Sequence, residues 1–310
     1  MTPARGANII MSSPHPRGAA MDISTLDRLT PADLHRCFLE AFSDYVVPAQ
    51  PSLGQLAFML RRRGWAPELS AGVWLDNLLV GFWLCATSDI DGETEGYCIA
   101  AGVVPAARRR GALTGMAAQV ESLLSARGIR RQRLEVIDGN LRAQQAYAAL
   151  GFSPLRQLDC YQIQTPIAAA GDWPVTVHAG YRTQDWPPAA GLAYPPAVPN
   201  RRESLLRAEP PPRWLAVRRD GRLLGSLLMS PDGEVAELTV APDCRRRGIA
   251  SRLLHAGQML ANGGRLSFNN VDNRDLALLS LLLKHQAGYR LSQWEMLKSA
   301  AADDGIRPGR

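Results

Sequence analysis

The sequence is poor in cysteine, and it contains no long hydrophobic run. Its five cysteines are scattered and never spaced as C-x-x-C, which argues against a disulfide framework or a zinc site and favours a reducing cytosol. The longest apolar stretch, LALLSLLL at residues 276–283, is far too short to span a membrane. The first residues lack the apolar core that a signal peptide needs. We therefore expect a cytoplasmic protein without a membrane partner.

The chain does contain enough apolar sequence for two hydrophobic cores. It has 310 residues, about twice the usual size of one domain, and 46% of them are hydrophobic. The beginning of the chain mixes Pro, Gly and Ser without periodicity, which predicts disorder. We expect a disordered leader at residues 1–20, a first domain at 21–165, a linker at 166–173, a second domain at 174–300 and a tail at 301–310.

The net charge of +6 is concentrated in three Arg-Arg-Arg runs, at residues 61–63, 108–110 and 245–247. A run of charges is usually a solvated surface, and for residues 61–63 this interpretation and a functional one are evenly balanced. Nucleic-acid binding is a rival explanation of the charge. The sequence has no helix-turn-helix or zinc pattern and no interleaved aromatic residues, however, so we expect no nucleic-acid partner.

Local patterns predict an α/β fold in each half. Thr30–Pro31 is placed to start a helix, strands follow, and a one-sided apolar stripe over residues 113–124 predicts a second helix. In the second part of the chain, Asp220–Gly221 marks a hairpin turn. A strand, a helix over residues 249–260, another strand and a helix over residues 275–286 follow. The order of elements is similar in both halves.

One nine-position pattern occurs twice. VVPAARRRGALT (residues 103–114) and VAPDCRRRGIAS (residues 240–251) share V-x-P-x-x-R-R-R-G, and each links a strand to a predicted helix, so we infer a tandem duplication. Cations are unfavourable at a helix N-terminus because the free N–H groups there already carry partial positive charge. They become favourable when an anion joins them, so the pattern predicts two phosphate sites.

These loops resemble the acetyl-CoA signature of the GNAT superfamily of N-acetyltransferases, [QR]-x-x-G-x-[GA] after a strand that ends in V-x-P. Arg245, Gly248 and Ala250 match it in full, whereas in the first half Arg108 and Gly111 match and Leu113 departs from it. The resemblance implies two tandem GNAT-type domains, each a mixed, mostly antiparallel sheet flanked by helices. It also implies acetyl-CoA as the cofactor and a primary amine as the acetyl acceptor.

The resemblance further implies which residues hold acetyl-CoA. The phosphates bind at the two loops, and the pantetheine arm hydrogen-bonds along the strand before each loop as an added strand would. The residues so assigned are Val103, Arg108, Arg109, Arg110, Gly111, Ala112, Leu113, Thr114 and Asn140 in the first half, and Leu238, Thr239, Val240, Arg245, Arg246, Arg247, Gly248, Ile249, Ala250 and Ser251 in the second.

A second family segment, N-x-x-A-x-x-x-Y-x-x-x-G-F, occurs in the first half. The matching residues are Asn140, Ala143, Tyr147, Gly151 and Phe152. The same residues also predict a helix, with Asn140 as its N-cap and Ala143 and Tyr147 on its core face. The structural and the functional interpretation are compatible. The resemblance implies that Tyr147 is the general acid for the CoA thiolate. Counting from Asn273, the corresponding position of the second half holds Ser280, so that half has the better loop and lacks the tyrosine.

Several alternatives stay open at this stage. Glu95, Glu135 and Glu237 are candidates for the base that deprotonates the amine, and each serves equally well as an ion-pair partner. Asp44 and Tyr45 are candidates to line the acceptor site. The second half is either a second active site or a degenerate copy that still binds CoA. The whole chain is either an N-acetyltransferase or a non-catalytic acyl-CoA sensor, and a homodimer is compatible with the sequence.

Overall fold

The structure, a computed structural model, describes residues 21–47, 49–169, 171–179 and 192–299. The predicted leader (1–20) and tail (301–310) lie outside the described residues, and both stay predictions. Below, "first half" means residues 21–165 and "second half" means residues 174–299. No helix in the described part of the chain combines the length and the hydropathy needed to cross a membrane.

The first half is a mixed sheet with helices on both faces. Its elements are β1 (Asp22–Thr25), α1 (Pro31–Ala41), α2 (Leu53–Arg63), β2 (Ala71–Leu75), β3 (Leu78–Ile90), β4 (Glu93–Val103), α3 (Ala112–Ser125), β5 (Arg131–Ile137), α4 (Leu141–Ala149) and β6 (Ser153–Ile163). Thr30 caps α1 by accepting a hydrogen bond from the Asp33 N–H, as the sequence predicts. Helix α2, which the sequence analysis did not identify, begins with a capping box formed by Ser52 and Gln55.

The second half repeats the strand-to-helix pattern. Its elements are β7 (Val175–Ala179), α5 (Arg202–Leu206), β8 (Arg213–Arg219), β9 (Arg222–Met229), β10 (Glu234–Val240), α6 (Ile249–Leu260), β11 (Leu266–Asp272), α7 (Leu276–Lys284) and β12 (Gly288–Ser299). The predicted hairpin turn lies between β8 and β9, where Asp220 has a φ of 51° and Gly221 a φ of 76°. Both residues have the left-handed backbone of a type I′ turn.

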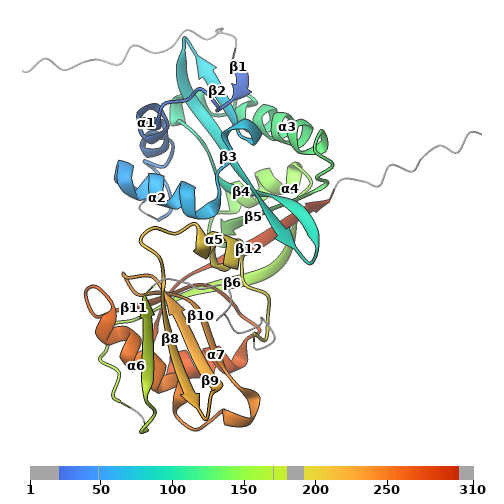
Figure 1. Ribbon diagram of the computed structural model, residues 1–310. Coiled ribbons are helices and arrows are strands. Elements are labelled where there is room, and N and C mark those ends of the chain that lie inside the picture. Colours follow the sequence, from blue (N-terminus) through green and yellow to red (C-terminus); the bar gives the residue numbers. More distant parts are fainter. Residues whose placement is uncertain (1–20, 48, 170, 180–191, 300–310) are drawn as a thin grey trace, which may run out of the picture.

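The two halves share one sheet because their last strands exchange partners. The order of its 12 strands is β1-β2-β3-β4-β5-β12-β6-β11-β10-β9-β8-β7. Strand β12 inserts between β5 and β6, and β6 pairs on its other side with β11. Figure 1 shows β6 and β12 running between the upper, first half and the lower, second half. The domain boundaries expected from the sequence therefore stay a prediction, since the sheet continues through both halves.

Helices cover opposite faces of the first half's sheet. Phe82 of β3 stacks on Phe38 of α1 with ring centroids 5.6 Å apart, while the next residue, Trp83, meets Tyr147 of α4 at 6.0 Å. Since successive side chains of a strand point to opposite faces, α1 and α4 lie on opposite sides of the sheet. Figure 1 shows the same division, with α1 and α2 on one side and α3 and α4 on the other.

Candidate functional site

A gap opens in the sheet of the first half between β4 and β5. The two strands are parallel but pair at only two positions, Gly96 with Gln132 and Tyr97 with Arg133. Strand β4 continues to Val103, so the strands diverge beyond Tyr97 and leave one edge of β4 without a strand partner. We call this space the first gap. Backbone N–H and C=O groups at such an edge are available to an extended ligand.

The second half has a matching gap between β10 and β11, which also pair in parallel at two positions only. We call it the second gap. Each gap begins at a β-bulge. In the register of β4 with β3, Ile99 has no partner, and in the register of β10 with β9 the same is true of Ala236. A bulge turns backbone groups out of the ladder, so both strands present irregular backbone at the same place.

The two arginine-rich loops have nearly the same backbone geometry. Each begins with a short 3₁₀ helix and ends at a glycine that caps the following helix, Gly111 for α3 and Gly248 for α6. The φ angles are 81° and 84° at the glycines, and 60° and 64° at Arg109 and Arg246. The match confirms that the repeated sequence pattern encodes one repeated structure.

The helix that follows each loop, α3 or α6, begins with N–H groups that no side chain of the described residues caps. The first N–H groups of a helix have no acceptor inside it. In α3 the first N–H bonded within the helix is that of Gly115, to the Gly111 carbonyl at 2.9 Å. A Cβ on Gly111 would meet no atom within 4 Å, so the left-handed backbone, together with open space, explains the glycine.

The first arginine of each loop is turned toward the protein. Arg108 donates from Nε to the Val103 carbonyl at 3.0 Å and from Nη2 to the Ala41 carbonyl at 3.0 Å. It also pairs with Asp44 through two bonds of 2.6 and 2.7 Å. Arg245 makes the equivalent Nε bond to the Val240 carbonyl, at 3.3 Å, and is exposed. Arg108 thus fixes the loop to the end of α1.

The other residues predicted to bind the cofactor differ in whether their side chains face solvent or the protein interior. Arg109, Arg246, Arg247 and Thr114 are exposed. The side chains of Ala112, Ile249 and Ser251 face the protein interior, and Ser251 hydrogen-bonds to His285 at 2.8 Å. Only the backbone N–H groups of these three residues are placed to meet a phosphate. The remaining assigned residues lie where the sequence places them, in the loops or on β4 and β10: Val103, Arg110, Leu113, Leu238, Thr239, Val240 and Ala250.

Tyr147 lies in α4, where it is 9% exposed. Its ring packs edge-to-face on Trp83 and Phe152, each at 6.0 Å. Burial, with Cys98 and Tyr45 nearby, raises the pKa of its hydroxyl well above the usual value. None of the described residues hydrogen-bonds to this hydroxyl. Tyr147 therefore keeps its proton and has no competing acceptor for it, as a proton donor requires.

The equivalent position of the second half is Leu282 and not Ser280. Helix α4 is capped by Asn140, and α7 is capped by Asp275, whose side chain accepts from the Leu278 N–H at 3.0 Å. Seven residues after each cap stand Tyr147 and Leu282. Counting from Asn273 failed because α7 starts two residues later than the sequence match suggests. Leu282 is 1% exposed and offers no proton.

Tyr45 follows α1, and it and its neighbour Asp44 contact the two sequence motifs of the first half, the segment at residues 140–152 and the arginine loop. Its hydroxyl hydrogen-bonds to Asn140, the N-cap of α4, and burial raises its pKa. Its neighbour Asp44 is exposed, and the hydrogen bonds from Arg108 hold the pKa of that carboxyl below its usual range. The loop after α1 is therefore fixed against both the arginine loop and α4.

The three candidate carboxylates have different surroundings. Glu95 is fully buried and is paired with Arg131 and Arg133, at 3.1 and 2.8 Å. It is a structural ion-pair partner. Glu135, on β5, accepts a hydrogen bond of 2.6 Å from the Tyr97 hydroxyl on β4, which bridges the base of the first gap. Glu237 is on β10 and lines the second gap.

Glu135 retains an unused oxygen. Its Oε1 is buried and has no hydrogen-bond partner among the described residues. Burial, with repulsion from Glu295, raises the pKa of this carboxyl to about 7, although Tyr97 and Arg63 oppose the shift. A carboxyl with that pKa and a free oxygen can accept a proton near neutral pH.

The second gap is covered by its own chain. Residues 192–200 lie over β10 and β11, and the Asn200 side chain donates to the Asn269 carbonyl of β11 at 2.9 Å. Arg156 of β6 donates to the Pro195 carbonyl at 2.6 Å, and Val198 is 1% exposed. These contacts hold the segment against β10 and β11.

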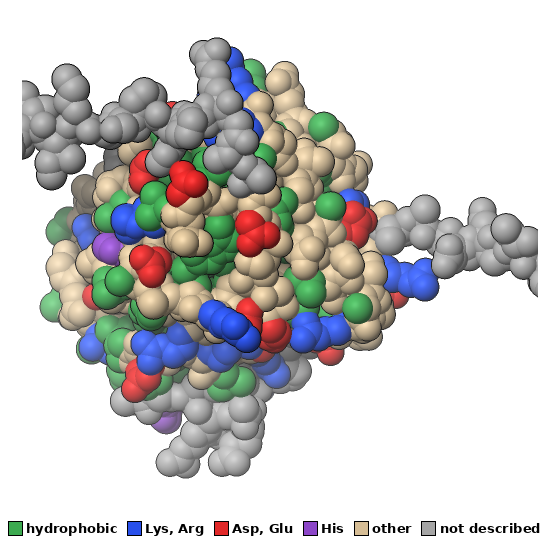
Figure 2. Space-filling view, turned by 90° about the horizontal axis from the view of Figure 1, so that it is seen from above, with side chains coloured by type: hydrophobic (Ala, Val, Ile, Leu, Met, Phe, Trp, Pro, Cys, Tyr) green, Lys and Arg blue, Asp and Glu red, His purple; other side chains and the backbone are tan. Residues whose placement is uncertain are grey.

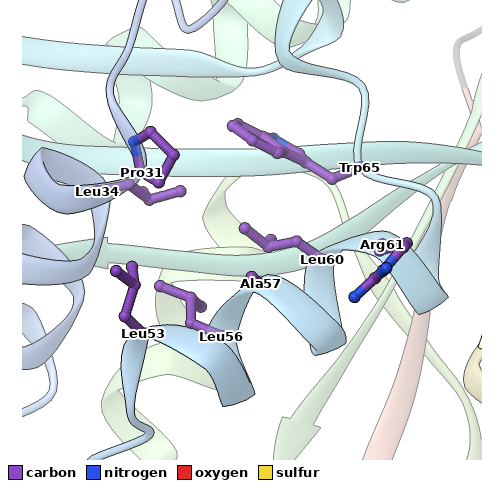
Figure 3. Close-up of a pocket in the computed structure, with 8 residues that line it drawn as sticks. All are labelled: Pro31, Leu34, Leu53, Leu56, Ala57, Leu60, Arg61 and Trp65. Atoms are coloured by element: carbon purple, nitrogen blue, oxygen red, sulfur yellow. The ribbon is translucent and has the colours of Figure 1, made fainter. Parts of the chain in front are cut away.

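A separate apolar groove of about 230 Å³ lies between α1 and α2. Figure 3 shows Pro31 and Leu34 facing Leu53, Leu56, Ala57 and Leu60, with Arg61 and Trp65 at one side. Arg61 is the single titratable group of this lining. The lining of this groove therefore offers no carboxyl, histidine or tyrosine for proton transfer.

These observations agree with the comparisons to known proteins. A model of the acetyltransferase (GNAT) family matches residues 33–152 and 181–275, more than half of the chain. The chain belongs to the GNAT family. It is therefore an acyltransferase of the GNAT type, with the family's domain present twice. No curated protein matches it.

Solved GNAT structures show the same fold at low sequence identity. A GCN5-related N-acetyltransferase from Sphaerobacter thermophilus is 15% identical, with 90% of this chain and 95% of that chain covered and a TM-score of 0.65. A tandem GNAT protein from the clavulanic acid biosynthesis pathway is 14% identical, with coverages of 92% and 100% and a TM-score of 0.66. The GNAT fold and its tandem arrangement, predicted from the sequence, are confirmed.

Charge on the surface is mixed where Figure 2 shows it. On that face, which carries the top of the first half, Lys and Arg side chains alternate with Asp and Glu. Ion pairs explain part of this mixture, for example Arg131 with Glu93 at 2.9 Å.

Proposed function

We propose that the protein transfers the acetyl group of acetyl-CoA to a primary amine and that the first half performs this chemistry. One observation carries the proposal. In the first half alone, a loop suited to bind an anion, a gap beside a bulged strand and a tyrosine on the helix that follows β5 occur together. The phosphates would bind the N–H groups of residues 111–114 and Arg109, and the pantetheine arm would lie along β4.

The residues of the first gap supply what the reaction needs. Acetyl-CoA supplies an acetyl thioester, at whose carbonyl carbon the amine nitrogen forms a C–N bond as the C–S bond breaks. Tyr147 gives its phenolic proton to the departing sulfur and regains one from water. A backbone N–H of β4 beside the bulge stabilises the negative charge that develops on the carbonyl oxygen.

We assign the base to Glu135. Its free Oε1 accepts the proton that the amine nitrogen loses, directly or through one water, and passes it to solvent. Glu95 has no such capacity because two arginines hold it. Glu135 is grouped with Arg63 of α2, on the face opposite α4 and Tyr147. The amine and the leaving sulfur are therefore served from opposite faces of the sheet.

The second half keeps a CoA-binding loop in this proposal but contributes no catalytic acid. Leu282 replaces the tyrosine, and residues 192–200 cover the second gap. Acetyl-CoA at the second loop would be held mainly by its phosphates. The acceptor is an amine whose identity the fold does not determine.

The test combines binding with turnover. Acetyl-CoA is titrated calorimetrically into the intact chain, and release of the CoA thiol is followed with a panel of small-molecule amines, polyamines, aminoglycosides and peptide N-termini. We expect saturable binding and amine-dependent thiol release with at least one class. Binding without release from any member would favour an acyl-CoA sensor. Salt-sensitive DNA binding without acetyl-CoA binding would favour the nucleic-acid alternative.

A further inference from the structure

The third arginine run, residues 61–63, has no counterpart in the GNAT loops. It forms the last turn of α2, which ends at Gly64 in a left-handed backbone conformation. Cations are favourable at this end of a helix, because the carbonyl groups there carry partial negative charge. The three side chains nevertheless go to three different places, and two of them are buried or half-buried.

Arg63 reaches the bulge of the first gap. Its Nη1 donates to the Ile99 carbonyl at 3.2 Å. Ile99 is the residue of β4 that has no partner in the register with β3. Its carbonyl therefore depends on a side chain for its hydrogen bond, and Arg63 provides it. The contact fixes the irregular backbone from which β4 faces the gap.

The same guanidinium lies beside the Tyr97–Glu135 pair. Burial alone would lower the pKa of Arg63, but the neighbouring Tyr97, Glu135, Glu234 and Cys98 outweigh it and raise that pKa. Arg63 therefore stays charged in a buried position. Its charge acts on the carboxyl whose Oε1 has no partner.

The second half holds this turn of α2 in place. Arg62 is buried and pairs with Glu234, the first residue of β10, at 2.7 and 3.2 Å. It also donates to the Pro199 carbonyl at 3.1 Å, in the segment that covers the second gap. Arg207 donates back to the Arg62 carbonyl at 3.3 Å. Arg63 is thus aimed into the first gap by a helix end anchored on the other half.

We propose that Arg63 is a positioning residue of the first-half site, which holds the β4 bulge and the Tyr97–Glu135 pair in the arrangement that receives the amine. The proposal rests on the proposed function. It also gives the second half a task that does not depend on its own loop being occupied, because contacts from β10 and residues 199–207 set the position of Arg63.

The experiment compares Arg63→Met with Arg61→Met in the full chain. Arg61 pairs with the exposed Glu209 and makes no contact with either gap, so it is a matched control from the same helical turn. For both variants we measure the dissociation constant of acetyl-CoA by calorimetry, kcat and KM for an amine that the wild type acetylates, and kcat against pH. Circular dichroism reports folding.

We expect Arg63→Met to bind acetyl-CoA as the wild type does, because the phosphate loop is untouched, and to lose about tenfold or more in kcat. Loss of the cation raises the pKa of Glu135, so the rising limb of the pH profile should move to higher pH by about one unit. The other charged groups around Glu135 are Arg133 on β5 and Glu295 on β12, and both remain. Arg61→Met should change neither quantity.

Two further variants cover the other outcomes. Arg63→Lys keeps the positive charge, so the rising limb of its kcat profile should lie close to the pH at which the wild type shows it. Tyr97→Phe removes the hydrogen bond to Glu135 without removing bulk and should move the limb in the same direction as Arg63→Met, which keeps the test available if Arg63→Met does not fold. Unchanged kcat and pH limb in Arg63→Met and Tyr97→Phe, with acetyl-CoA still bound, would overturn the proposal. A wild type that does not bind acetyl-CoA would instead contradict the proposed function.

Discussion

The two halves have the same loop and differ in the gap beside it. Residues 103–114 and 240–251 follow one backbone path, with the same left-handed positions and the same arginine-to-carbonyl bond. In the first half, Tyr97 and Glu135 bridge the base of the gap, and Tyr147 of α4 packs on the opposite face of the sheet. In the second half, Leu282 of α7 takes the position of the tyrosine, and residues 192–200 lie against β10 and β11. Both halves thus keep the backbone of the loop, whereas the tyrosine and the Tyr97–Glu135 pair, to which we assign proton transfer, occur in the first half.

The half with the better match to the loop signature is therefore not the half to which we assign the chemistry. The signature [QR]-x-x-G-x-[GA] describes a backbone that binds an anion, and Leu113 departs from it without changing the φ angle of Gly111 relative to Gly248. A match to this signature therefore predicts cofactor binding and says nothing about proton transfer. The residues to which we assign proton transfer are distant from the loop in sequence, and the sheet brings them near it.

The largest expected effect is the loss of acetyl-transfer rate when Tyr147, which occurs in the first half only, is replaced. Tyr147→Phe should keep acetyl-CoA binding and slow acetyl transfer by roughly 10²-fold or more, because the departing thiolate loses its proton donor. The ring stays, so the packing on Trp83 and Phe152 is retained. Steady-state thiol release at alkaline pH gives the rate. Leu282→Val, at the matching position of the second half, is the control, and an unchanged rate in Tyr147→Phe would remove Tyr147 from the mechanism.

The loops themselves are compared by Gly111→Val and Gly248→Val. Each substitution puts a β-branched residue at a φ above 80°, a conformation that such residues avoid, and crowds the N–H groups of the helix start. We expect Gly111→Val to weaken acetyl-CoA binding at the catalytic site by roughly tenfold or more, at a cost of more than about 1.4 kcal/mol. Gly248→Val should leave turnover unchanged. Calorimetric stoichiometry assigns each site, and equal losses of turnover in both variants would contradict the division of labour.

The contact between the halves is tested by Arg62→Met. The substitution leaves Glu234, whose pKa Arg62 holds down against the effect of burial, without its buried cation. Breaking such a pair should lower the free energy of unfolding by about 3 kcal/mol. Arg61→Met breaks an exposed pair and should cost less than about 1 kcal/mol. Urea denaturation of both variants measures the difference, and similar midpoints would mean that the buried pair does not join the halves.

Glu135 in the first half and Glu237 in the second are both carboxyls whose pKa burial raises to about 7. Because each binds its proton more tightly in the folded state, stability falls as pH rises from about 4.5 to 7. Replacing either by Gln should therefore raise the free energy of unfolding at pH 8 by roughly 1–3 kcal/mol. Glu237→Gln should leave acetyl transfer intact, whereas Glu135→Gln should abolish most of it. Denaturation at pH 5 and pH 8 measures the stability change.

The sequence predicts those parts of the molecule that local signals determine. The two loops, the caps at Thr30 and Asn140 and the hairpin at Asp220–Gly221 depend on neighbouring residues, and the structure has each where the sequence places it. Helix α2 was also predictable, because Ser52 and Gln55 form a capping box three residues apart.

Other features depend on long-range pairing, which no local pattern encodes. The exchange of β6 and β12 follows from which strand edges are free once both halves are assembled. The roles of Arg62 and Arg63 are equally invisible in the sequence, since three identical neighbours point to Glu209, Glu234 and the β4 bulge. The position of Leu282 required the true start of α7, which the Asp275 N-cap indicates.

The strand exchange also has a consequence during synthesis. On the ribosome, β5 emerges long before β12, yet β12 is the strand that pairs with β5 along seven residues, up to Ser299 with Arg131. Until nearly the whole chain has been released, β5 keeps an unpaired edge, and β6 lacks both of its eventual neighbours. Nascent chains of intermediate length therefore expose strand edges that invite chaperones or pairing with other chains.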